Sequence, residues 1–247
     1  MSAAFSSLHL PAALAGAVWP GAAPDALGAL RRRGVSSGWH ELDGELPAGG
    51  WPRGELSEIL SPRPATLEWR LLGPALRGVA AAGGSVLLVG PPQPPYLPGL
   101  RQAGVEPARL VWVQGDSVAE RLWCAEQLLD AAGAVLLWLP QAQPAPLRRL
   151  HARAAGGDAL LFALRPWSAR AESSPAPLRV LARPGDGWTL QLQLFKRRGA
   201  PQEQALALHA PPAAFDAVLP PRLRGAQSAE TQLESDDAVG RVAPAAA

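Results

Sequence analysis

The residues from 46 to 68 have the order of a phosphate-binding site. A glycine-rich turn over 46–54 precedes a short apolar run over 55–60, which predicts a buried strand. In a phosphate-binding loop, G-x-x-x-x-G-K-[ST] follows such a strand, and its backbone N–H groups and lysine contact the phosphate oxygens. The same window here starts at Ser61, with Thr66 at the second glycine, Leu67 at the lysine and Glu68 at the hydroxyl residue.

These replacements remove the chemistry that a phosphate needs. Pro64 has no N–H to donate, and Glu68 brings a negative charge to the place where phosphate would lie. The window therefore predicts a degenerate loop that binds no nucleotide.

Hydrolysis of ATP also requires an acid at the end of a central strand, which holds magnesium. The predicted strands over 85–89 and 134–139 run into Gly90-Pro91 and Pro140, without a carboxylate. We therefore expect no catalytic residue, no cofactor and no enzymatic activity, and a divergent ATPase is the least favoured alternative.

The candidate metal ligands are scattered. Histidines stand at 9, 40, 151 and 209, without a partner at ligand spacing, and Cys124 is the single cysteine. The sequence predicts no metal site and no disulfide framework.

Helical spacing of apolar residues alternates with short apolar runs along the chain. Helices are expected over 65–82, 99–104, 118–132 and 144–154, and strands over 55–60, 85–89, 110–113, 134–139, 159–164, 178–183 and 188–196. Ser117 and Glu120 form a capping box before the third helix. This alternation, with a late pair of strands, predicts an α/β fold whose mostly parallel sheet has an antiparallel edge.

The chain has 247 residues, of which 48% are hydrophobic, and a net charge of +2. We expect an N-terminal helical segment over 1–34, a core over 35–200 and a C-terminal segment over 201–247. Residues 226–247 are acidic and lack periodicity, which predicts a disordered tail. No long apolar run and no signal peptide are evident, so the expected location is the cytoplasm.

Two stretches have the composition of contact surfaces. Lys196, Arg197 and Arg198 form a basic cluster that suits DNA phosphate or an acidic protein face; a charged strand end that discourages aggregation is an equal alternative. Beyond the predicted core, apolar residues recur in a segment expected to order on a partner. These are Leu206, Leu208, Phe215, Val218 and Leu219.

Four segments carry a resemblance to a known family. They are the turn and strand from Leu42 to Leu56, the helical Leu122-Trp123-Cys124-Ala125-Glu126-Gln127-Leu128, the run from Ser174 to Arg179, and Lys196-Arg197-Arg198-Gly199. In this order they resemble the bacterial ImuA family, which is RecA-like. The turn alone is also similar to RecA.

The resemblance implies a RecA-like core and a role as a non-catalytic subunit in translesion synthesis, the mutagenic DNA repair of the SOS response to DNA damage. It implies an ImuB-type partner, which is an inactive homologue of Y-family polymerases. Through that partner it implies an error-prone C-family polymerase and a sliding clamp, with DNA and RecA as further candidates. The family is also similar to the SulA inhibitors of cell division, which is the alternative function.

Overall fold

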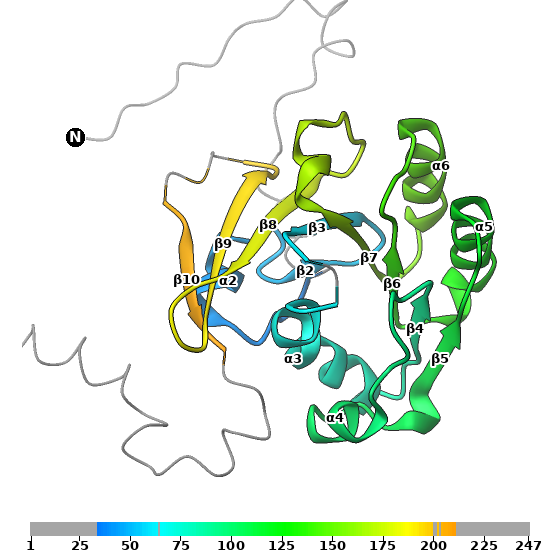
Figure 1. Ribbon diagram of the computed structural model, residues 1–247, viewed down its shortest axis with the longest axis horizontal. Coiled ribbons are helices and arrows are strands. Elements are labelled where there is room, and N and C mark those ends of the chain that lie inside the picture. Colours follow the sequence, from blue (N-terminus) through cyan, green and yellow to red (C-terminus); the bar gives the residue numbers. More distant parts are fainter. Residues whose placement is uncertain (1–33, 64, 200–201, 203, 211–247) are drawn as a thin grey trace, which may run out of the picture.

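The computed structural model describes residues 34–63, 65–199, 202 and 204–210. Helices alternate with strands, as the sequence predicts, and a central sheet lies between two helical layers (Figure 1). The elements in chain order are β1 Gly34–Val35, α2 His40–Glu45, β2 Trp51–Pro52, β3 Leu56–Ser61, α3 Glu68–Ala81, β4 Val86–Val89, α4 Leu97–Gln102, η1 Pro107–Arg109, β5 Leu110–Val113, α5 Val118–Leu128, η2 Leu129–Ala131, β6 Ala134–Trp138, α6 Pro144–Ala154, β7 Leu160–Pro166, η3 Trp167–Ala171, β8 Leu178–Pro184, β9 Thr189–Lys196 and β10 Leu206–His209.

Within the described residues, the main sheet has eight strands in the order β10-β9-β8-β3-β7-β6-β4-β5. The six strands from β8 to β5 in this order are parallel, and β9 and β10 are antiparallel to their neighbours. The inner strands β4 and β6 are apolar along their length because helices cover both of their faces.

Each face of the sheet has its own hydrophobic core. On one face α2, α3 and α4 pack through residues such as Leu42, Leu72 and Leu100. On the other face α5 and α6 pack through Leu122 and Leu147. The sheet is therefore the middle of three layers, which confirms the predicted α/β class.

Several predicted boundaries are confirmed. The helix over 144–154 and the strand over 110–113 begin and end where the sequence places them. The capping box is formed, since the Ser117 side chain accepts the Glu120 N–H and the Glu120 carboxylate accepts the Ser117 N–H. Among the described residues, no helix has the length and apolar character needed to cross a membrane.

The C-terminal boundary of the core requires a correction. β10 pairs with β9, Leu208 is buried and Leu206 packs against the same core, which extends to Ala210 rather than ending at 200. Leu206 and Leu208 are thus sheet residues and not part of a free binding segment. Phe215, Val218, Leu219, the acidic tail over 226–247 and residues 1–33 lie outside the described residues.

Candidate functional site

Residues 61–68 lie at the position where open α/β sheets bind ligands. β3 has β7 on one side and β8 on the other, while the chain leaves β3 through α3 toward β4 on the β7 side. The strand order therefore reverses at β3, and ligands bind beyond the carboxyl ends of the strands at such a switch point. Residues 61–68 occupy this place between β3 and α3.

The carboxylate of Glu68 takes up the backbone donors of this loop. One oxygen, Oε1, accepts the N–H of Ala65 at 2.8 Å, and Oε2 accepts the N–H of Leu67 at 3.0 Å. Glu68 is 2% exposed and is the first residue of α3, where the helix dipole favours a negative charge. A side chain of the protein thus stands at the site where a phosphate-binding loop would hold its phosphate.

The rest of the loop is also turned inward. The Leu67 side chain, which replaces the lysine, is buried in the core beside α3. The hydroxyls of Ser61 and Thr66 both donate to the carbonyl of Arg63, at 3.0 and 2.7 Å. Each sequence-predicted loop residue therefore has a local partner or a place in the core.

Arg121 lies at the carboxyl ends of β4 and β6. Its guanidinium donates to the carbonyls of Gly115, at 2.9 Å, and Trp138, at 3.2 Å. It also crowds Gly90 at the end of β4, where an added Cβ would lie 2.4 Å from Nε. A cation thus lies where a hydrolytic site of this architecture needs a magnesium-binding acid.

A buried charge network links β3, β7 and β8, and it was not predicted from the sequence. Glu58 on β3 accepts from Arg165 on β7 at 3.3 Å and from Arg179 on β8 at 2.6 Å. The Ser174 hydroxyl donates to the same carboxylate at 2.8 Å. The Glu58 and Arg165 side chains are fully buried and Arg179 is nearly so, which requires these charges to pair with one another.

The same arginines anchor the segment between β7 and β8. Arg165 also pairs with Glu172 at 2.6 Å, and Arg179 donates to the carbonyls of Ala169 and Glu172. Since this segment holds no regular helix beyond η3, its path over the sheet depends on these bonds. The network therefore has a structural role, because its two arginines hold Glu58 and this segment in place.

The predicted basic cluster makes contacts within the protein. Arg197 binds Glu45, Arg198 binds Glu55, and Lys196 donates to the carbonyl of Ser174 at 2.8 Å. Burial, together with the charge of Arg179, lowers the pKa of Lys196. These bonds favour the interpretation of the cluster as a charged strand end.

His151 on α6 contacts the amino end of β3. Its Nδ1 accepts the N–H of Leu56 at 3.2 Å, which requires the neutral imidazole. Burial lowers the pKa of His151; Glu55 acts in the opposite direction, while Arg198 and Lys196 lower it further. The described residues contain no group of three or more side chains that could hold a metal ion.

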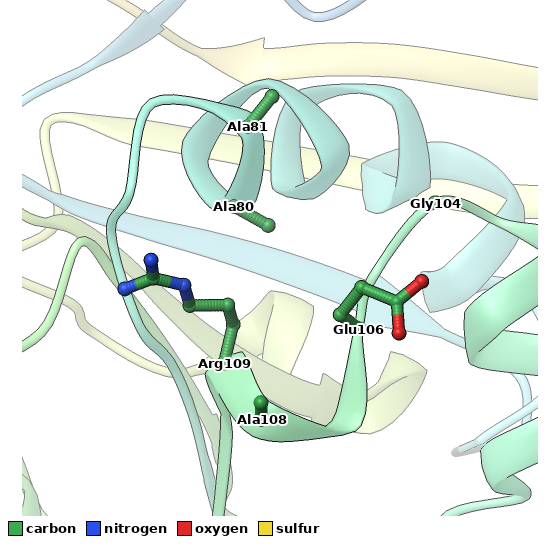
Figure 2. Close-up of a pocket in the computed structure, with 6 residues that line it drawn as sticks. All are labelled: Ala80, Ala81, Gly104, Glu106, Ala108 and Arg109. Carbon is green, nitrogen blue, oxygen red and sulfur yellow. The ribbon is translucent and has the colours of Figure 1, made fainter.

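A small cavity of about 320 Å³ lies at the C-terminal end of α3 (Figure 2). Residues 61–68 are at the other end of this helix. Alanines form much of its lining, with Glu106 and Arg109 at its border; the lining residues are Ala80, Ala81, Gly104, Glu106, Ala108 and Arg109. Arg109 is engaged with the carbonyl of Gly83. The cavity therefore offers little converging polar chemistry.

Comparisons with protein-family models and with curated proteins find no match for this chain. The contacts of Glu68 and Arg121 at the carboxyl ends of the strands are therefore what the structure itself contributes to a functional assignment.

Proposed function

We propose that this chain is a non-catalytic accessory subunit of a DNA-damage-induced translesion synthesis complex. Its direct partner in this proposal is an ImuB-type inactive homologue of Y-family polymerases. The non-catalytic character rests on the geometry of Glu68, and the assignment to this complex rests on the four segments that resemble the ImuA family.

The Glu68 contacts are the observation that carries the proposal. Nucleotide binding at this loop would require a phosphate to displace a buried carboxylate from the N–H groups of Ala65 and Leu67. The phosphate would also meet the negative charge of Glu68 without a lysine to offset it, because Leu67 is in the core. Binding energy for a partner must then come from other surfaces.

A RecA-like core with a degenerate phosphate-binding loop is the finer fold assignment that we propose. It is supported by a central parallel strand, β3, that leads through an eight-residue window into α3. The antiparallel pair β9 and β10 at one side of the parallel strands is consistent with it.

Among the four segments, α5 offers an exposed anchor for the partner. Segments 42–56 and 196–199 bind each other through Glu45 and Glu55, and Ser174 and Arg179 bind the buried Glu58. In contrast, Trp123 on α5 is 59% exposed although Leu122 and Ala125 beside it are buried. An exposed tryptophan on a rigid helix is typical of the residues that dominate protein interfaces.

Capture of the ImuB-type protein by the full chain tests this proposal. Co-expressed wild-type protein is expected to retain the partner, and Trp123→Ala should weaken capture at least about tenfold, as loss of an interface anchor does. Tyr96→Ala is the matched control, because Tyr96 is 73% exposed at the start of α4, on the opposite face of the sheet.

The outcomes separate the parts of the proposal. Failure of the wild-type chain to bind the ImuB-type protein would overturn the assigned function. Full capture by Trp123→Ala would leave the function standing but exclude α5 as the anchor. The segment with Phe215, Val218 and Leu219 would then be the next candidate.

A further inference from the structure

β5 forms an open edge of the main sheet. It pairs with β4 on one side, and no described strand pairs with its other side, so a row of backbone N–H and C=O groups faces outward. Val111 and Trp112 on this strand are 45% and 44% exposed. Since neighbouring side chains of a strand point to opposite faces, apolar surface is exposed on both sides of the edge.

Three of the features that protect sheet edges are missing from β5. Proteins block open edges with charges, prolines or bulges, or keep the edge strand short. The sequence Leu110-Val111-Trp112-Val113 contains no charged residue and no proline, and its pairing with β4 has no register shift. The strand is short, with four residues, but its apolar edge is a surface onto which another strand can add.

We propose that the edge of β5 binds β5 of a second copy of this chain, in antiparallel orientation, to form a symmetric dimer. The two-fold axis passes through the sheet at Trp112. The two sheets then continue into one another, and both Trp112 side chains are buried against each other.

The faces of the sheet limit the register. Directly opposed residues of antiparallel strands have their side chains on the same face, so Val111 can meet Val111 or Val113 of the second copy but not Trp112. An axis at Trp112 pairs Trp112 with itself and Val111 with Val113. An axis at Val113 would instead place Val111 and Trp112 opposite Gly115 and Gln114.

Charges at the two ends of β5 favour a second copy in antiparallel orientation as the occupant. The exposed Arg109 precedes the strand and the exposed Asp116 follows it. In an antiparallel pair, the strand end next to Arg109 lies beside the strand end of the second copy that is next to Asp116. The axis at Trp112 opposes Val111, Trp112 and Val113 with strand residues of the second copy, whereas an axis at Val111 would leave Val113 beyond the end of the other strand.

The dimer should be weak, because a strand of four residues buries less surface than a standard stable interface. Sedimentation velocity of the full chain over a concentration series should therefore show a reversible monomer–dimer equilibrium. Trp112→Lys should shift this equilibrium to monomer, since it places like charges opposite each other at the axis. Trp123→Lys on α5 is the control, with an equally drastic change at an exposed tryptophan outside the edge.

A disulfide test checks the register independently of any loss of folding. In a Cys124→Ser background, Trp112→Cys should form a dimer-linking disulfide under mild oxidation, because residues on the axis are opposed at about 4.5–5.5 Å between Cα atoms. Val111→Cys should not, because its copies lie diagonally at roughly 7 Å.

Wild-type chain that remains monomeric at all concentrations would overturn the proposal, as would equal cross-linking by both cysteine variants. A monomeric chain in which Trp112→Lys reduces capture of the ImuB-type protein would assign the edge to that partner instead of a second copy. Because Trp123 and Trp112 are changed separately, failure of the dimer is distinguishable from failure of the proposed function.

Discussion

Glu58 and Glu68 are two buried glutamates ten positions apart, one within β3 and one just after it, and their charges are satisfied in different ways. Glu68 accepts two backbone N–H groups from residues within three positions in the chain. Glu58 accepts from Arg165 and Arg179, which are 107 and 121 positions away. One carboxylate completes a local turn, and the other holds three strands and a connecting segment together.

The difference lies in where each carboxylate finds its donors, which is local for Glu68 and distant in sequence for Glu58. At Glu68 the backbone donors that could serve a phosphate are already used, so the loop is complete without a ligand. At Glu58 the charges neutralise each other inside the sheet, and none remains for chemistry. Both carboxylates stabilise the fold, but they should respond differently to substitution.

The largest effect is expected from the tertiary network. Arg179→Ala should destabilise the protein by about 3–5 kcal/mol, since it leaves the Glu58 carboxylate buried with less compensation. Chemical denaturation measures the change, with the exposed Arg183→Ala on the same strand as control, which should stay within about 0.5 kcal/mol. A loss below about 1 kcal/mol for Arg179→Ala would mean that water reaches Glu58.

A smaller effect is expected at the local turn. Glu68→Ala should cost about 1–3 kcal/mol, because the N–H groups of Ala65 and Leu67 lose their acceptor. Glu68→Gln should fall between this variant and wild type, since its amide oxygen can accept only from one side. Exposed Glu106→Ala is the control, and equal denaturation midpoints for all four proteins would show that solvent satisfies the loop.

The amino end of β3 should respond to pH. The folded-state pKa of His151 lies below its ordinary value of 6.5, so the unfolded chain binds the proton more readily. The neutral imidazole's contribution to the free energy of unfolding is therefore fully present above about pH 6.5, and it is lost as the pH falls toward the folded-state pKa.

His151→Gln keeps an acceptor for the Leu56 N–H and removes the titration. When the pH is lowered from about 7.5 to about 5.5, the denaturation midpoint should fall less for the variant than for wild type. An identical fall in the two proteins would assign the acid sensitivity to other groups.

No effect at all is expected when Mg-ATP is added. Calorimetric titration of the wild type should be silent, and so should that of Glu68→Ala, because freeing the N–H groups does not restore a lysine at Leu67. Binding tighter than about 100 μM, or about −5.5 kcal/mol, by the wild type would contradict the closed-loop interpretation.

The sequence alone was sufficient for features that depend on neighbouring residues. Apolar periodicity located the strand over 110–113 and the helix over 144–154, and the spacing of Ser117 and Glu120 located a helix start. Each of these depends on backbone geometry within a few positions, which local residue types largely determine.

Only the tertiary structure decided which distant charges meet. Arg197 and Arg198 have the composition of a binding patch, but the fold places Glu45 and Glu55 beside them from residues about 150 positions earlier. The pattern of Leu206 and Leu208 likewise fits either a free segment or an edge strand, and pairing with β9 selects the strand. In the sequence, Glu58 is a single charged residue within an apolar strand. In the fold, β7 and β8 place Arg165 and Arg179 on either side of it. Composition determines what a side chain can bind, and the strand order determines whether the protein itself already supplies that partner.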